Sequence, residues 1–359
     1  MDLNFENTND RNTNMKNSLT KRKTLAVMTA EAYAQNKRLA APLVGFPGCD
    51  LLNMSIKVAQ QNYGMHYNCI EALVNRLKPD AAFMMMDLSV EANALGLPVR
   101  FPTHESSTVE HHPINTVDDL DYLRQINILQ DARIQSYIKT IEMMKLGLPD
   151  NVLVGAYVIG PVTLAGLLEG AQQVAFDSIL EPEKLDEFCR FSTSIIMEYA
   201  RSLVNAGADV LCILEPTGVI LGPEQFDRFS GHYVNHILQS YKYAGVDTIY
   251  HICGNTMHLI NGMVKSGVGA ISIDSPETGF DIVKALEQVP QKVVVIGNVN
   301  PTKVMKDGTP EEVAKETKDL LEKTAKYPNF LLSTGCDLPP GTPLKNMQVF
   351  METARKFKI

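Results

Sequence analysis

DTIYHICGN, residues 247–255, joins a short apolar run to a polar ending that contains a glycine. The run Asp247–Ile252 has the length of a strand and little polar alternation, which is typical of strands buried on both faces of a parallel sheet. Gly254 allows the sharp turn that leads from such a strand into a helix. Seven further runs of this kind lie along the chain: Ala41–Phe46, Ala81–Met86, Val152–Val158, Asp209–Leu214, Ala270–Ile273, Lys292–Ile296 and Phe330–Ser333.

Stretches with helical periodicity separate these runs. Eight strands that alternate with helices predict an α/β fold, a (β/α)8 TIM barrel, and a doubly wound open sheet is the alternative. The long gap between Met86 and Val152 predicts insertions in the early βα loops. Two helices begin with start signals, at Ser275-Pro276 and Thr309-Pro310. The clearest helical stretches are Pro182–Ala206, Pro223–Tyr243, Asn255–Lys265, Pro276–Gln288 and Thr309–Lys326.

The domain organisation follows from what separates these elements. Residues 19–359 contain no linker rich in Pro, Gly or Ser, so we expect a single barrel domain. Residues 1–18 are polar and lack the apolar segment of a secretory signal, which predicts a disordered or loosely docked arm. The apolar stretch 152–171 contains Gly160-Pro161 and Glu169, so we expect a strand followed by a helix and not a membrane span.

Charge and cysteine usage exclude several classes of protein. The chain has a formal net charge of -8, and its one dense basic run, Lys21-Arg22-Lys23, is short. A nucleic-acid surface needs clustered basic residues, so we expect neither a nucleic-acid nor a membrane partner. The six cysteines are unevenly spaced and no export signal precedes them. This pattern predicts reduced thiols in the cytoplasm, some of which could bind metal.

Two strand ends carry residues that suit a metal ion. His251 and Cys253 are two residues apart and therefore point to the same side of an extended chain. Cys336 follows the eighth strand, at the end of the barrel where such enzymes place their chemistry. One nitrogen and two thiolates suit Zn(II) and leave a fourth position open. A buried structural His-x-Cys pair, with the other cysteines as small core residues, is the competing interpretation.

Other polar residues follow predicted strands. Glu215 ends the fourth strand. Its carboxylate could hydrogen-bond to a metal ligand, serve as a displaceable fourth ligand, or be a plain helix-capping or loop carboxylate. Asp87 follows the second strand, at the catalytic end of the barrel, and is with Asn255, Asn298 and Asn300 a candidate contact to the corrinoid. Asn298 and Asn300 follow the seventh strand, as contacts to a substrate or corrinoid or as turn formers. Asn255 follows the His-x-Cys pair and could orient a ligand or cap the next helix.

Several motifs together resemble a known family. They are MDLSVEANALG (86–96), GPVTLAG (160–166), AGAD (206–209), HICGN (251–255), SIDS (272–275), GNVNP (297–301) and STGCDLPPGTPLKN (333–346). From about residue 20 to its end, the chain resembles the uroporphyrinogen decarboxylase superfamily, and within it the zinc-dependent corrinoid methyltransferase branch. The resemblance implies that His251, Cys253 and Cys336 are zinc ligands. It also implies the TIM-barrel fold.

The resemblance also implies a reaction. In the methyltransferase branch, a methyl group passes from methyl-Co(III) on a corrinoid protein to a zinc-bound thiol such as coenzyme M. The alternative is the first methyltransferase of an O-demethylase-type system, in which a methyl donor methylates Co(I). The same three ligands suit either direction of transfer.

Two interpretations fall outside methyl transfer. One is a decarboxylase acting on a tetrapyrrole with many carboxylates. The decarboxylases carry arginines after the first strand and a His at the position of Cys336, whereas GFPGCD (45–50) has no arginine. Carboxylates buried there would lack cationic partners, so we do not expect decarboxylation. The other is a non-catalytic, corrinoid-protein-binding relative that keeps zinc for structure.

Overall fold

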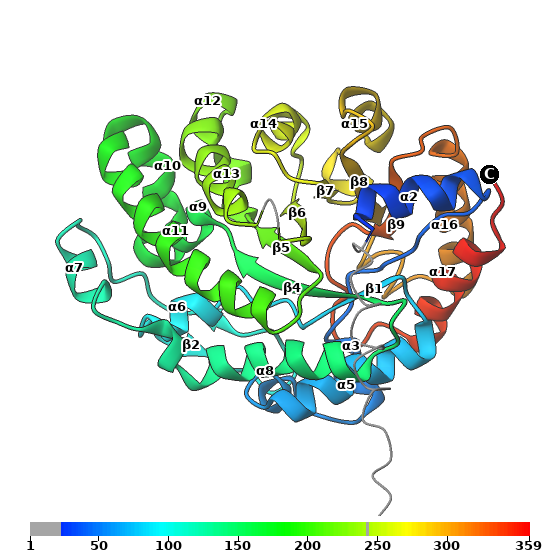
Figure 1. Ribbon diagram of the computed structural model, residues 1–359, viewed down its shortest axis with the longest axis horizontal. Coiled ribbons are helices and arrows are strands. Elements are labelled where there is room, and N and C mark those ends of the chain that lie inside the picture. Colours follow the sequence, from blue (N-terminus) through cyan, green and yellow to red (C-terminus); the bar gives the residue numbers. More distant parts are fainter. Residues whose placement is uncertain (1–22, 242–243) are drawn as a thin grey trace, which may run out of the picture.

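Seven parallel strands form the centre of the protein (Figure 1). The computed structural model describes residues 23–241 and 244–359. Every strand of this sheet pairs with the next one along the chain, in the order β1-β4-β5-β6-β7-β8-β9, and every described pairing is parallel. This α/β architecture is that of a TIM-type barrel. The strands are β1 Ala81–Phe83, β4 Leu153–Ile159, β5 Val210–Leu214, β6 Asp247–Ile252, β7 Ala270–Ile273, β8 Val294–Val299 and β9 Phe330–Thr334.

Helices surround the strands on their outer side (Figure 1). The longest is α11, which begins at Pro182 as the sequence predicts and ends at Asn205. Thr309 caps α16 through a reciprocal pair of hydrogen bonds with Glu312. The helices of more than one turn are α2 Leu25–Ala34, α3 Pro47–Leu51, α5 Tyr63–Leu77, α6 Val90–Ala94, α7 Asp119–Leu123, α8 Ala132–Gly147, α9 Pro161–Glu169, α10 Ala171–Leu180, α11 Pro182–Asn205, α13 His232–Gln239, α14 Ile260–Lys265, α15 Ile282–Gln288, α16 Pro310–Lys323 and α17 Leu344–Lys356.

Short helical segments of three to five residues complete the outer layer. They lie mostly at the ends of longer helices or directly after strands. The turn η3 is π-helical and joins α12 to α13 within one predicted helix. These short elements are α4 Ile56–Ala59, η1 Ile128–Gln130, η2 Pro216–Ile220, α12 Pro223–Phe226, η3 Asp227–Gly231, η4 Met257–Leu259 and η5 Pro276–Thr278.

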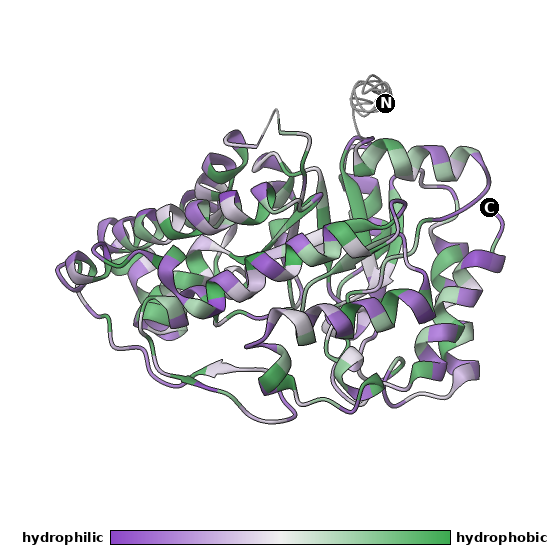
Figure 2. Cartoon of the chain, turned by 60° about the horizontal axis from the view of Figure 1, so that its bottom comes forward, coloured by the Kyte–Doolittle hydropathy of each residue, from purple (hydrophilic) through white to green (hydrophobic). Residues whose placement is uncertain are grey.

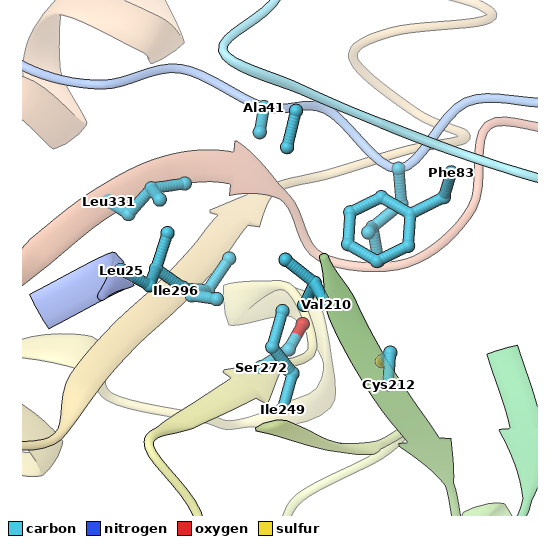
Figure 3. A pocket seen from close by; sticks show the side chains of 11 residues that line it. Leu25, Ala41, Phe83, Val210, Cys212, Ile249, Ser272, Ile296 and Leu331 are labelled. Carbon is cyan, nitrogen blue, oxygen red and sulfur yellow. The ribbon is translucent and has the colours of Figure 1, made fainter. Parts of the chain in front are cut away.

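Apolar side chains fill both faces of the sheet. Every residue of β4, β5, β7, β8 and β9 is buried, which explains why these runs lack polar alternation. Figure 2 shows hydrophobic strands at the centre and helices that mix hydrophobic with hydrophilic residues. Inside the ring, side chains from most strands and Leu25 of α2 line a cavity of about 20 Å³ (Figure 3). That volume holds about one water molecule, so the barrel interior is a packed core.

The first predicted strand, Ala41–Phe46, is not a strand, and that prediction was wrong. Only Ala40 forms a bridge, to Leu332 of β9. Pro42 has no N–H to donate to a ladder, and the N–H of Leu43 goes to the Thr334 side chain at 3.0 Å. The segment still occupies the eighth position, because Ala41 N donates to Leu332 O and Asp80 N, just before β1, donates to Ala40 O. Residues 39–43 therefore bridge the two edge strands.

Insertions lie in two βα connections. Between β1 and α8 the chain forms α6, α7 and a two-stranded antiparallel ribbon of β2 (Val99–Arg100) and β3 (Thr108–Val109), which matches the predicted early insertion. Between β4 and α11 it forms the two extra helices α9 and α10. The stretch 152–171 is indeed a strand followed by a helix. None of the described helices combines the length and apolar character that crossing a membrane requires. The predicted arm, 1–18, lies outside the described residues.

Arg38 fixes the bridging segment to the end of α16. Its guanidinium is 7% exposed and donates to the carbonyl oxygens of Thr324, Ala325 and Tyr327 at 2.6–2.9 Å. Carbonyls at a helix end lack partners within the helix, so a buried guanidinium satisfies several at once. Burial lowers the pKa of Arg38 to about 10.

We expect Arg38→Met to lower the free energy of unfolding by about 3 kcal/mol, because several buried carbonyls lose their donor. Urea unfolding followed by circular dichroism measures this change. Arg190→Met is the matched control, because Arg190 is 64% exposed and forms an ion pair with Glu187 of its own helix. The control should change stability by less than about 1 kcal/mol. Equal effects of the two variants would contradict a role for Arg38 in closing the barrel.

Candidate metal centre

The register of neighbouring strands determines where His251 lies. His251 pairs with Leu214 of β5 on one side and with Ser272 of β7 on the other. Its side chain is 1% exposed, and its Nδ1 lies 3.0 Å from the hydroxyl of Ser272. This contact fixes the orientation of the ring and leaves Nε2 free for another partner.

Three side chains converge at the carboxyl end of the sheet. Cys253 Sγ lies 3.3 Å from His251 Nε2, and Cys336 Sγ lies 3.5 Å from Cys253 Sγ and 3.7 Å from the same nitrogen. The three atoms all lie within 4.8 Å of one another. Among residues 23–241 and 244–359, no other group of three or more His, Cys, Asp or Glu side chains meets this condition. We call these three residues the His-Cys-Cys group.

A glycine allows Cys336 to reach the group from a strand that is not adjacent to β6. A Cβ atom on Gly335 would lie 2.5 Å from the backbone nitrogen of Ser275, closer than real Cβ atoms come. Gly335 N donates to Val299 O at the end of β8. On the other side, Asp274 accepts a hydrogen bond from Gly254 N at 2.7 Å. Strand ends of β6, β7, β8 and β9 are thereby held against one another.

The donor set fits a zinc ion. The pKa of the Cys336 thiol is raised well above its ordinary value, first by its hydrogen bond with Cys253 and then by burial, while His251 opposes the rise. Two thiolates facing each other without a cation are costly, and a divalent cation removes that cost. One imidazole nitrogen and two sulfurs are ligands that zinc prefers, and they leave one tetrahedral position open. Cys253 and Cys336 are each partly exposed as residues, whereas His251 is buried.

Glu215 lies beside the group but is held by other partners. Its carboxylate is fully buried and accepts hydrogen bonds from Thr163 N and Oγ1 at 2.6 Å, from Val162 N and from Ser230 Oγ. Two of these donors are backbone N–H groups of the first turn of α9, so Glu215 caps that helix. Burial raises the pKa of Glu215 despite these hydrogen bonds. Its own N–H donates to His251 O at 2.9 Å, which ties it to β6.

Asp87 lies in a buried polar network on the insertion side of the barrel. It forms an ion pair with Arg133 of α8 and accepts hydrogen bonds from Tyr137 at 2.9 Å, from Gln60 at 2.7 Å and from Ser89. Burial alone would raise the pKa of Asp87, but the charge of Arg133 with these hydrogen bonds lowers it. Asp87 therefore joins α8 to the insertion that follows β1.

The three predicted asparagines differ in which of their side-chain hydrogen-bonding atoms have a partner. Asn255 is exposed and accepts a hydrogen bond from Met257 N. Asn300 accepts from Thr302 N and Lys303 N, as the first residue of a turn does. Asn298 is fully buried and its Nδ2 donates to Asp274 O at 2.8 Å, while its Oδ1 has no hydrogen-bond partner.

Tyr157 and Asp337, which the sequence analysis did not single out, also lie near the group. The Tyr157 hydroxyl and Asp337 Oδ2 are buried and have no hydrogen-bond partner. Burial raises the pKa of Tyr157 well above its ordinary value, and the nearby charges of Asp337 and Cys336 add to this rise. Burial and Cys336 likewise raise the pKa of Asp337. Asp337 could have been found from its place next to Cys336, but Tyr157 is hidden in an apolar run.

The chain is similar to known methyltransferases and decarboxylases. The methylcobamide:CoM methyltransferase MtbA of Methanosarcina acetivorans is 28% identical over 283 residues, which cover 78% of this chain and 80% of that protein. A uroporphyrinogen decarboxylase of Prochlorococcus marinus is 25% identical over 310 residues, covering 84% and 87%. A solved methyltransferase from Methanosarcina mazei superposes with a TM-score of 0.81 at 22% identity, over 94% of this chain and 99% of that one. This last likeness shows that the two share a fold.

The family model described as uroporphyrinogen decarboxylase (URO-D) matches residues 53–357. The match begins ahead of β1 and ends just after α17, so it takes in all seven strands of the parallel sheet and the His-Cys-Cys group. The chain therefore belongs to the uroporphyrinogen decarboxylase (URO-D) family.

Proposed function

We propose that this protein is a methyltransferase that moves a methyl group between a corrinoid, carried by a partner protein, and a small thiol such as coenzyme M. The observation that carries the proposal is the convergence of His251 Nε2 with the sulfurs of Cys253 and Cys336. The likeness to methylcobamide:CoM methyltransferase supports the reaction class. The six cysteines are all unpaired, which supports a reducing cytoplasm as the location.

In this proposal, His251, Cys253 and Cys336 hold one zinc ion. When bound, zinc supplies a Lewis acid that keeps a thiol as its thiolate at neutral pH. Ser272 holds the imidazole so that the lone pair of Nε2 faces the two sulfurs. The partial exposure of both cysteines allows a small thiol to approach from the open end of the barrel.

The residues around GFPGCD (45–50) do not favour decarboxylation of a tetrapyrrole. Phe46, Gly48 and Cys49 are buried, and Asp50 accepts a hydrogen bond from Gly341 N. This segment offers no cationic side chain to a substrate with several carboxylates. Burying such carboxylates without partners would be costly.

The other predicted site residues take three different places in the proposal. Asn298 has a free acceptor and is the one we assign to contact with the substrate or corrinoid. Corrinoid contacts stay a prediction for Asp87, Asn255 and Asn300. Each of these side chains already makes a local hydrogen bond, so none has the free acceptor that Asn298 has. We assign Glu215 to holding α9 and the end of β6 in place.

We expect the purified protein to bind about one zinc per chain and Cys336→Ser to weaken zinc binding by more than about 100-fold. Loss of a direct ligand should exceed the 10- to 100-fold effect of residues that only orient ligands. Elemental analysis after dialysis against a chelator measures this. Cys189→Ser is the control, because Cys189 is a buried cysteine of α11 outside the His-Cys-Cys group. Unchanged zinc affinity in Cys336→Ser would contradict the three-ligand site.

Thiol dependence tests the reaction itself. We expect incubation of the zinc protein with methylcobalamin to give demethylated cobalamin only when a small thiol is present, as measured from the visible spectrum. Cys336→Ser should lower the rate at least tenfold. If demethylation needs no thiol, or if the protein instead methylates Co(I) from an added methyl ether, the O-demethylase-type reaction would replace the present proposal.

Glu215→Gln separates a supporting role from that of a fourth ligand. The amide would point an N–H group at donors that now face a carboxylate, so we expect the free energy of unfolding to fall by about 2 kcal/mol. Zinc content should not change. Glu224→Gln, at an exposed position of α12, should alter neither quantity. A loss of zinc in Glu215→Gln at unchanged stability would make Glu215 a ligand.

A further inference from the structure

Cys49 and Cys69 bring two thiols into contact outside the His-Cys-Cys group. Their Sγ atoms lie 3.8 Å apart, and the Sγ of Cys69 also lies 3.8 Å from the Sδ of Met54. Cys49 is 1% exposed and Cys69 is fully buried. Neither forms a disulfide, so the two residues are a reduced pair of neighbouring thiols.

The backbones that carry the two cysteines are in direct contact. Cys49 lies on α3 and Cys69 on α5, and these helices pack side by side (Figure 1). A Cβ atom on Gly48 would lie 2.4 Å from Cys69 O and 3.0 Å from Cys69 Cβ, so no side chain fits between the helices there. To form a disulfide the two sulfurs must approach by about 1.8 Å. Because the backbones already touch, rotation of the side chains between staggered rotamers supplies most of this approach.

The contact between the sulfurs makes the two thiols unequal. Their hydrogen bond lowers the pKa of Cys69, against the effect of burial, and the same hydrogen bond together with burial raises the pKa of Cys49. The thiolate is the nucleophilic form of cysteine, so Cys69 is the one that reacts first with an oxidant. Cys49 then lies next to the oxidised sulfur. A reactive thiol beside a second thiol that resolves it is the arrangement found in redox-sensing cysteine pairs.

Only a thin layer of protein separates the pair from solvent. α3 is five residues long, and Asp50, directly after Cys49, is exposed, as is Leu52. Met54 is half-buried, and its thioether is the group that touches Cys69. The methionine side chain is unbranched and flexible, so its movement opens a path to the sulfurs. Hydrogen peroxide, which is only slightly larger than water, is an oxidant that fits such a path.

The segment that carries Cys49 also holds the loop that follows Cys336. Asp50 accepts a hydrogen bond from Gly341 N at 2.8 Å, and Gly341 belongs to the loop between β9 and α17. A disulfide would draw Cys49 toward Cys69 and shift Asp50 with it. N–H···O hydrogen bonds span only about 2.7–3.2 Å, so such a shift breaks the contact between Asp50 and the loop.

We propose that Cys49 and Cys69 are a peroxide-sensitive dithiol, and that their oxidation to a disulfide releases the loop after Cys336 and slows the reaction at the His-Cys-Cys group. The Cys69 thiolate attacks one peroxide oxygen, the O–O bond breaks, and hydroxide leaves and is protonated to water. Cys49 then attacks the resulting sulfenic acid, which forms the S–S bond and releases a second water. Two electrons pass from the two thiols to the peroxide. The effect on the reaction rests on the proposed function, whereas the disulfide itself does not.

Peptide mapping by mass spectrometry tests the dithiol. The zinc-loaded protein is treated with hydrogen peroxide, the remaining thiols are alkylated, and oxidised and cross-linked peptides are quantified over time. We expect the Cys49–Cys69 cross-link to form at least about tenfold faster than any oxidation of Cys189, and dithiothreitol to remove it. Cys189 is the internal control, because it is fully buried and burial raises its pKa well above the ordinary value. No cross-link, or oxidation of Cys189 at an equal rate, would overturn the dithiol.

Hydrogen exchange and activity test the effect on the loop. In oxidised protein that retains its zinc, we expect the Gly341 amide to exchange about tenfold faster, because it loses a hydrogen bond to a charged group. Methyl transfer from methylcobalamin to coenzyme M should fall by a few-fold, and dithiothreitol should restore both quantities. Zinc is measured in every sample, so that oxidation of the His-Cys-Cys group is recognised as a separate loss.

Two variants assign the response to the pair. Cys69→Ala cannot form the disulfide, so peroxide should cause no reversible change in exchange or activity, whereas Cys189→Ala should respond as the wild type does. A Cys49–Cys69 disulfide without any change in exchange or activity would overturn the effect on the loop. No methyl transfer by the reduced protein would overturn the proposed function and leave the dithiol, which peptide mapping of the wild type decides even if Cys69→Ala does not fold.

Discussion

The in-register pairing of parallel strands is the constraint on which the candidate site depends. It sets His251 beside Ser272 and brings the strand ends to one end of the barrel. The pairing alone does not place Cys336, because β8 separates its strand from β7. Gly335 allows Cys336 to reach the His-Cys-Cys group, because the chain at Gly335 lies against the backbone of Ser275, where no side chain fits. Backbone contacts between the strand ends therefore determine where the side chains of the His-Cys-Cys group lie.

Most of the fold could be predicted because strands buried on both faces are continuous apolar runs. β6 and β7 have the predicted bounds, and the other strands are shifted by a few residues at their ends. The failure at Ala41–Phe46 has a local cause, since Pro42 breaks the ladder while the apolar pattern continues. Composition identified the segment as buried, but only the path of β1 and β9 shows that it bridges them.

The candidate site could be predicted where the spacing of residues along a strand determines which side chains lie together. His251 and Cys253 share a side because of their two-residue separation, and Cys336 was found from its strand end and from family resemblance. The Glu215 carboxylate, by contrast, meets Thr163 of another element, which a single sequence does not reveal. Tyr157 illustrates the same limit, because an apolar run does not indicate which residue will face the reactive end of the barrel.

The positions of the two proposed cysteine ligands also bear on how the barrel is held closed. Cys253 and Cys336 are 83 residues apart, and β7, β8 and β9 lie in the interval. An ion bound by both would link positions separated by that interval, and because it binds the folded chain and not the unfolded one, it would stabilise the fold by mass action. The proposed ion would then resist the opening of this part of the chain in addition to serving the site.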